Sequence, residues 1–152
     1  MISLPAGYAI KALGVLAEAN GGPLLIRQIA ERTGLPTPYL AKIANMLAQR
    51  GVLRTQRGVG GGVRLMDDAA RISLYRICEA LDDDITKRLC MLHTAKCSDE
   101  RACPAHHFWT QQRDRQVEFL QSTTLADVAD FEARQRRIHG VPTVDPRTLK
   151  AG

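Results

Sequence analysis

The chain has 152 residues, of which 45% are hydrophobic and 24% are charged, and its net charge is +5. This composition is typical of one folded domain with an appended helix or two, and it excludes an intrinsically disordered chain. No apolar run approaches the roughly 20 residues that span a bilayer, and the first residues carry no cleavage-like export signal. We therefore expect a cytoplasmic protein without membrane contact, whose four cysteines serve metal or redox chemistry before disulfides.

Basic residues are concentrated in one segment of the N-terminal half. Residues 23–65 contain seven Lys or Arg against one acid, whereas residues 77–152 contain eleven Lys or Arg against twelve Asp or Glu. A concentrated basic segment suits a polyanion, because neutralised phosphates release condensed counterions. A solvated basic surface would give the same pattern, so the charge alone does not decide between the two.

Apolar residues at helical spacing predict three helices, at residues 7–20, 25–32 and 37–50. Thr37 is expected to cap the third helix, with Pro38 at its first helical position, where the missing N–H costs nothing. The second and third helices are joined by a four-residue turn that contains Gly34. This pattern is typical of a helix-turn-helix, although a plain helical hairpin would share it.

Residues 52–57 and 63–66 alternate in the manner of strands on either side of a glycine-rich run, 58–62. The positions expected to face inward are Leu53, Thr55, Val63 and Leu65. A hairpin directly after a helix-turn-helix predicts a wing, and its glycine-rich tip would allow close approach to a sugar–phosphate backbone. A phosphate-binding loop is excluded, because no Gly-Lys-Ser/Thr follows and a strand comes next.

The second half is predicted to contain three further helices, at residues 73–81, 104–121 and 125–137. Ser73 is expected to cap the first of these helices, and Cys78 within it is expected to be a buried core residue. Residues 85–104 show no sustained periodicity and are predicted to form a loop. The chain from Gly140 onward is predicted to be a disordered tail.

Three of the cysteines lie in the predicted loop. Cys90, Cys97 and Cys103 are separated by six and five residues, and His106 follows three residues after the last of them. Structural zinc sites usually pair ligands two to four residues apart, so the wider gaps suit an iron–sulfur cluster, although free thiols or a thiol redox switch also fit. His106 is the best-placed fourth ligand, because the first turn of a helix is fixed relative to Cys103. The alternatives are a carboxylate, a group from a partner subunit, His93 and His107.

Taken together, these residues resemble the IscR, NsrR and RirA type of winged-helix regulators over about residues 7–133. The runs that carry the resemblance, with the three-cysteine loop, are Tyr8-Ala9-Ile10-Lys11-Ala12-Leu13, Arg27-Gln28-Ile29-Ala30-Glu31-Arg32, Pro38-Tyr39-Leu40, Arg57-Gly58-Val59-Gly60-Gly61-Gly62 and Ile72-Ser73-Leu74. The resemblance implies a mainly α fold, with a winged helix-turn-helix head, a small β-hairpin wing and a long C-terminal dimerisation helix. It also implies a homodimer that binds palindromic operators in double-stranded DNA and senses iron–sulfur, iron, redox or nitric oxide status. The implied cofactor is an iron–sulfur cluster, with 2Fe–2S favoured over 4Fe–4S.

The resemblance assigns roles to individual residues. Cys90, Cys97 and Cys103 match the cluster thiolates, and His106 matches the histidine that IscR itself uses. Tyr39 and Lys42 match groove-facing positions of the recognition helix, and Arg57 matches the wing arginine that enters the minor groove. Together with residues chosen for their place on the third helix and the wing, the expected DNA contacts are Thr37, Tyr39, Lys42, Asn45, Gln49, Arg57, Gly58 and Arg64. Two departures limit the comparison: Ala41 replaces a frequent glutamate, so operator choice is not carried over, and the first cysteine gap is wider than in IscR.

The expected organisation is a winged helix-turn-helix at residues 1–82, a cluster loop at 83–104, dimerisation helices at 105–138 and a disordered tail at 139–152. A winged-helix regulator with a cluster-free thiol-redox switch or a zinc site is the alternative function. A small iron–sulfur electron carrier or scaffold is a third hypothesis, against which the basic winged segment argues. No Ser–His–Asp grouping, paired carboxylates or cofactor loop appears in the sequence, so we do not expect an enzyme.

Overall fold

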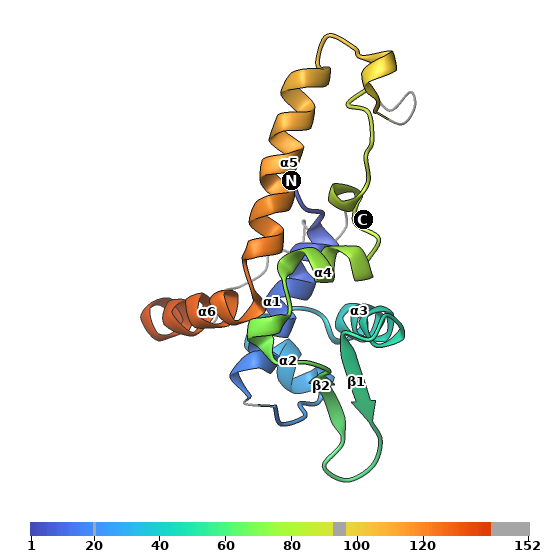
Figure 1. Cartoon of the computed structure of the whole chain (residues 1–152). Coiled ribbons are helices and arrows are strands. Elements are labelled where there is room, and N and C mark those ends of the chain that lie inside the picture. The colour runs from blue at the N-terminus through green and yellow to red at the C-terminus, as the bar shows by residue number, and fades with distance from the viewer. Residues whose placement is uncertain (20, 93–96, 141–152) are drawn as a thin grey trace.

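The computed structural model describes residues 1–19, 21–92 and 97–140. Within these residues the chain forms the predicted mainly helical winged fold, with six α-helices and one antiparallel hairpin (Figure 1). Their bounds are α1 (Leu4–Glu18), α2 (Ile26–Thr33), α3 (Thr37–Gln49), β1 (Leu53–Gln56), β2 (Gly62–Leu65), α4 (Leu74–Ala80), α5 (His106–Ser122) and α6 (Leu125–His139). The connections contain three short 3-10 turns, η1 (Ala69–Arg71), η2 (Asp84–Thr86) and η3 (Asp99–Arg101). The tail predicted to be disordered lies outside the described residues from 141 onward.

The helix α1 is the centre of the head and begins earlier than predicted. Ser3 caps it by accepting a hydrogen bond from the N–H of Ala6, and Pro5 lies in the first turn, where its missing N–H needs no partner. The helices α2, α3, α4 and α6 all pack around α1. Its residues are therefore buried on several sides rather than along one stripe. The buried residues of α1 are Ala6, Ala9, Ile10, Ala12, Leu13, Gly14, Val15 and Leu16.

The helices α2 and α3 form the predicted helix-turn-helix. Gly34 ends α2 in a left-handed conformation, with a φ of 73°, and its N–H donates to the carbonyl of Ala30. The prediction that Thr37 caps α3 is wrong, because Thr37 is already helical and Pro36 occupies the cap position without a side-chain hydrogen bond. The reason is that Pro36 already has the extended backbone of a cap residue, with a ψ of 134°.

The wing is the predicted antiparallel hairpin of β1 and β2. Leu24 and Val63 exchange two backbone hydrogen bonds, of 3.0 and 2.8 Å, which attach the hairpin to the segment before α2. Gly62 is required at this point, because its φ is 144° and a Cβ there would overlap the carbonyl of Leu24. The prediction that Thr55 faces the core is wrong: Thr55 is exposed, because the wing extends beyond the core after Leu53.

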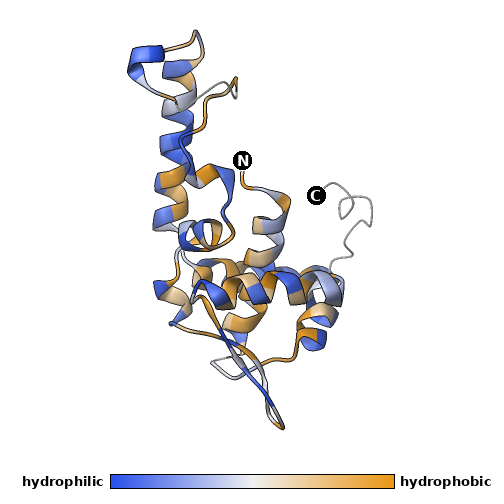
Figure 2. Ribbon diagram, turned by 90° about the vertical axis from the view of Figure 1, so that its right-hand side faces the viewer, coloured by the Kyte–Doolittle hydropathy of each residue, from blue (hydrophilic) through white to orange (hydrophobic). Residues whose placement is uncertain are grey.

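The helix α5 forms an arm that points away from the head, and the described residues between α4 and α5 run beside it (Figure 1). Figure 2 shows hydrophilic residues along the middle of α5, whereas hydrophobic residues are concentrated in the helices of the head. The helix α6 turns back to pack on α1, and its first residue, Leu125, donates its N–H to the carbonyl of Ile72 at 2.8 Å. Thr124 caps α6 together with Asp127, and the hydrogen bonds from Thr124 lower the pKa of Asp127. Among the described helices, none is both long and apolar enough to cross a membrane.

We expect the substitution Leu125→Ala to lower the free energy of unfolding by about 2–5 kcal/mol, as truncation of a buried leucine usually does. Leu125 is 0% exposed and belongs to the core of the head. Ile138, which is 69% exposed on the same helix, gives a matched control, and Ile138→Ala should change stability by less than about 0.5 kcal/mol. Urea unfolding followed by circular dichroism measures both values. Equal losses in the two variants would show that Leu125 does not anchor α6.

Candidate functional site

One face of α3 carries four of the eight residues predicted to contact DNA. Leu40, Ile43 and Leu47 are buried against the head. The predicted contacts that are exposed on α3 are Thr37, Lys42, Asn45 and Gln49. The last three are spaced three and four residues apart, so they form one stripe along the helix, away from the buried side.

Tyr39 differs from the other predicted contacts because it is partly buried. Its ring meets the ring of Tyr8 on α1 edge-on, with 5.8 Å between centroids. Burial, and then the neighbouring Tyr8, raise the pKa of the Tyr39 hydroxyl. The Tyr39 ring therefore packs α3 against α1, which fixes the orientation of the helix that carries the polar stripe.

The wing presents several arginines. Arg57 and Gly58 are exposed directly after β1, and Arg64 lies on β2 opposite Arg54 of β1. Like charges directly opposite one another destabilise a hairpin, and no acid of the described residues pairs with either arginine. A phosphate between them would relieve this repulsion. Sequence reasoning did not single out Arg54, and the signal that could have done so is the hairpin register that places it opposite Arg64.

His106 contacts Cys97 and Asp99 through its two ring nitrogens, where the cysteine loop meets α5. The Nδ1 atom of His106 lies 3.1 Å from the Sγ atom of Cys97, and its Nε2 atom lies 2.8 Å from Oδ1 of Asp99. His106 is the first residue of α5 and is 4% exposed. Of the alternative histidines, His107 is exposed and His93 lies outside the described residues.

The other loop cysteines are not gathered around this contact. Two cavities of about 240 Å³ each share Trp109 and Arg113 in their walls, and Cys97 lines one while Cys90 lines the other. Cys103 is partly exposed just before α5, and none of the four cysteines is in a disulfide. In the described part of the chain, no three Cys, His, Asp or Glu side chains are grouped closely enough to hold one metal ion.

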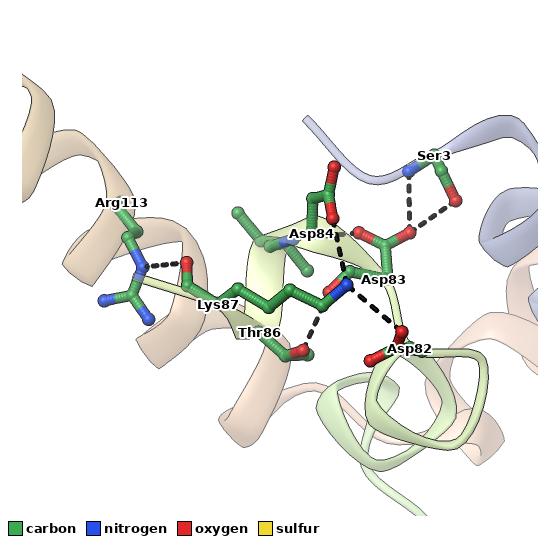
Figure 3. Close-up of polar contacts among 8 residues, drawn as sticks. Ser3, Asp82, Asp83, Asp84, Thr86, Lys87 and Arg113 are labelled. Carbon is green, nitrogen blue, oxygen red and sulfur yellow. Dashed lines mark hydrogen bonds and ion pairs between the residues drawn. The ribbon is translucent and has the colours of Figure 1, made fainter. Parts of the chain in front are cut away.

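The start of the cysteine loop is hydrogen-bonded to the first turn of α1 (Figure 3). Asp83 is 5% exposed and accepts hydrogen bonds from the N–H and the hydroxyl of Ser3 and from the N–H of Ile85. Ser3 is also the residue that caps α1. One buried carboxylate therefore joins the beginning of the loop to the central helix of the head.

A second set of contacts joins the same part of the loop to α5. The Nζ atom of Lys87 lies 3.1 Å from Asp82 and 3.2 Å from Asp84, and the hydrogen bonds to these carboxylates raise the pKa of Lys87. The carbonyl of Lys87 accepts a hydrogen bond of 3.2 Å from Nε of Arg113 on α5 (Figure 3). The beginning of the loop is thus bonded to both the head and the arm.

Cys78 is buried in α4, as predicted, with 0% exposure. Burial, and then the nearby Asp83 carboxylate, raise the pKa of the Cys78 thiol to about 11. The stability that comes from the neutral thiol is fully present below about pH 8.5, the ordinary cysteine value. It is lost as the pH rises toward about 11, because the unfolded chain then releases a proton that the folded chain retains.

We therefore expect the parent protein to lose stability relative to Cys78→Ala above pH 9, by about 1.4 kcal/mol for each pH unit. Urea unfolding of both proteins at intervals between pH 7 and pH 11 measures the difference. The difference should be constant below pH 8. A difference that stays constant up to pH 11 would contradict the assigned environment of Cys78.

Comparisons with known proteins agree on the class of protein. The family model described as "Rrf2: Iron-dependent Transcriptional regulator" matches residues 2–130. The HTH-type transcriptional regulator IscR of Salmonella agona is 30% identical over 151 residues, which cover 95% of this chain and 91% of that protein. The structure of CymR, the global cysteine regulator of B. subtilis, superposes with a TM-score of 0.72 at 26% identity and covers 86% of this chain and 97% of its own. The structure of T. potens IscR gives a TM-score of 0.68 at 26% identity, with coverage of 89% and 90%.

Proposed function

Because the chain belongs to the Rrf2 family of transcriptional regulators, we propose that it is a homodimeric, cytoplasmic regulator that binds palindromic DNA and senses its signal through an iron–sulfur cluster. The cluster reports iron–sulfur, iron, redox or nitric oxide status. Its ligands are Cys90, Cys97, Cys103 and His106. The observation that carries the proposal is the contact of Cys97 with His106 in a loop that is hydrogen-bonded to the DNA-binding head.

The DNA contacts follow from the exposed stripe of α3 and from the wing. Side chains such as Lys42 and Asn45 can reach base edges in the major groove, where base pairs are distinguishable. Arg57 at the wing suits the minor groove, where narrow A·T-rich stretches concentrate negative potential. Arg54 and Arg64 would meet phosphates, which position the protein without reading the sequence.

The residues of the loop fit an iron–sulfur cluster in their chemistry. Thiolates and imidazoles are known ligands of such clusters, and Cys97 and His106 already face one another. The Nε2 atom of His106 bonds a carboxylate, as the second nitrogen of a ligating histidine usually does. When bound, the cluster would supply an iron centre that oxidants or nitric oxide can alter.

The signal can reach DNA through the contacts at the start of the loop. A ligand changes the affinity for DNA only if it interacts differently with the competent and incompetent states of the head. Asp83 joins the loop to Ser3 at the start of α1, and α1 packs against both helices of the helix-turn-helix. A loop that rearranges on loss of the cluster would therefore shift α1 relative to α3.

Exposed aromatic residues on α5 and α6 support the homodimer. Phe108 and Phe119 on α5 are 66% and 60% exposed, and Phe131 on α6 is 51% exposed. Large apolar side chains that remain in contact with water are typical of interaction surfaces when they gather on one element. A second copy of the chain would cover them and place two α3 helices at the half-sites of a palindrome.

Anaerobic purification tests the proposal. The protein should be red-brown, should contain iron and acid-labile sulfide, and should bind an operator with an affinity that changes when the cluster is removed. Optical and Mössbauer spectra of the same sample distinguish 2Fe–2S from 4Fe–4S. A colourless protein with stoichiometric zinc would overturn the cluster assignment and leave the DNA-binding assignment standing.

A cluster-free thiol switch is the second candidate. It is favoured by the absence, among the described residues, of three donors grouped around one point. In that case the iron-free protein should bind its operator with an affinity that changes on treatment with peroxide. If the cysteines hold zinc instead, the affinity should change on treatment with a chelator.

A further inference from the structure

The ring of His106 is held between two residues of the cysteine loop. Its Nδ1 atom lies 3.1 Å from Cys97 Sγ and its Nε2 atom lies 2.8 Å from Asp99 Oδ1. An ionised carboxylate can only accept a hydrogen bond, so in the neutral ring the Nε2 atom carries the proton. The Nδ1 atom is then left with its lone pair directed toward the thiol of Cys97.

We propose that Asp99 is the residue that positions His106 for metal coordination, by accepting the Nε2 proton and presenting Nδ1 as the ligating atom. This inference rests on the proposed function, because it takes His106 as a ligand. Asp99 would not touch the metal and would act through the imidazole. Such outer partners usually change metal affinity by about 10–100-fold when they are removed.

The backbone of His106 is fixed independently of Asp99. The N–H of His106 donates to the carbonyl of Cys103 at 2.9 Å, and the carbonyl of His106 accepts a hydrogen bond of 2.8 Å from the hydroxyl of Thr110. The start of α5 therefore sets the position of the Cα atom. The backbone contacts do not determine how the ring is oriented or which nitrogen carries the proton. These depend on the contacts of the ring itself, and Asp99 is the charged acceptor among them.

The effect of Asp99 on His106 depends more on the position of its acceptor oxygen than on its negative charge. Its side chain is 98% exposed while that of His106 is 5% exposed, so water screens the carboxylate but does not reach most of the ring. Substitution with asparagine keeps an oxygen acceptor at the same place. We therefore expect Asp99→Asn to retain most of the effect that Asp99→Ala abolishes.

Nuclear magnetic resonance of the metal-free protein tests the tautomer. At pH 8 under reducing conditions, ¹⁵N-labelled His106 should show a slowly exchanging proton on Nε2. That signal should be lost in Asp99→Ala and retained in Asp99→Asn. Glu100→Ala, which removes an exposed acid from the same turn, is the matched control and should retain it. A proton on Nδ1, or an unchanged signal in Asp99→Ala, would overturn the proposal.

Titration of the metal-free protein with Co²⁺ tests coordination. Thiolate-to-cobalt absorbance should report binding, and Asp99→Ala should weaken it by about 10–100-fold, whereas Glu100→Ala should change it by less than about twofold. In a His106→Ala background, Asp99→Ala should have no further effect. Equal weakening in that background would show that Asp99 does not act through the histidine, and failure of the parent protein to bind Co²⁺ would overturn the coordination role.

The two proposals fail in different ways. A parent protein that contains no iron or sulfide after anaerobic purification would remove the iron–sulfur function, while the cobalt and resonance results would still decide the role of Asp99. A parent protein that holds its cluster with unchanged tautomer and cobalt affinity in Asp99→Ala would remove the positioning role alone.

Discussion

The Cys97→Ala protein should contain no iron–sulfur cluster and should keep the helical content of the parent. Cys97 is the cysteine in contact with His106, so its loss removes one thiolate and the neighbour that faces the imidazole. It lies outside the hydrophobic core of the head, so the helices do not depend on it. Iron and acid-labile sulfide analysis after anaerobic reconstitution measures the first effect, and far-ultraviolet circular dichroism measures the second.

Cys78→Ala is the matched control for this experiment. Cys78 is 0% exposed within α4, so its truncation should cost about 1 kcal/mol of stability at neutral pH and leave the cluster in place. If Cys78→Ala loses the cluster and Cys97→Ala retains it, the assignment of the ligands is wrong.

Substitutions on α3 and on the wing should weaken DNA binding in two distinguishable ways. Asn45→Ala should cost about 1–3 kcal/mol on the specific operator and little on random DNA, because base-edge contacts discriminate between sequences. Arg57→Ala should weaken binding more broadly, with some loss of preference for A·T-rich flanks, and should reduce the slope of log affinity against log salt by about 1, because one positive charge is lost from the minor groove. Titrations against one operator at several salt concentrations measure both.

Arg137→Ala provides the control for the loss of one positive charge, because Arg137 is exposed on α6 away from the wing. It should leave both the affinity and the salt slope close to those of the parent. Unchanged affinity and slope in Arg57→Ala would mean that the hairpin is not a DNA-contacting wing.

Most of the fold could be predicted from local patterns in the sequence. The turn at Gly34, the cap at Ser73 and the alternation of the wing strands each depend on a few neighbouring residues. The predictions were wrong where the local structure depends on contacts with distant parts of the chain or on which of two adjacent residues takes the cap position. Thr55 continues the inward alternation of β1 but has no core to face, and Pro36 takes the cap position that Thr37 could have taken.

The candidate site was predicted less completely, for a related reason. Residue types and spacing identified Cys97 and His106, which the structure brings together. Asp99 was not predicted, because an exposed acid in an irregular loop has no periodic signal. The hydrogen bonds by which Asp83 joins the loop to α1 were also not predicted, because its partner Ser3 lies 80 positions away in the sequence.

The packing of α6 on α1 has a consequence for synthesis of the protein. Glu18 and Arg136, which form an ion pair between these helices, are 118 positions apart in the chain. At about 5–20 residues per second, α6 begins to be made roughly 4–15 seconds after α3 is complete. During this interval the hydrophobic surface of α1 that later receives α6 stays uncovered. We therefore expect prematurely terminated chains to be removed by proteases or chaperones before they can occupy operators and compete with the finished regulator.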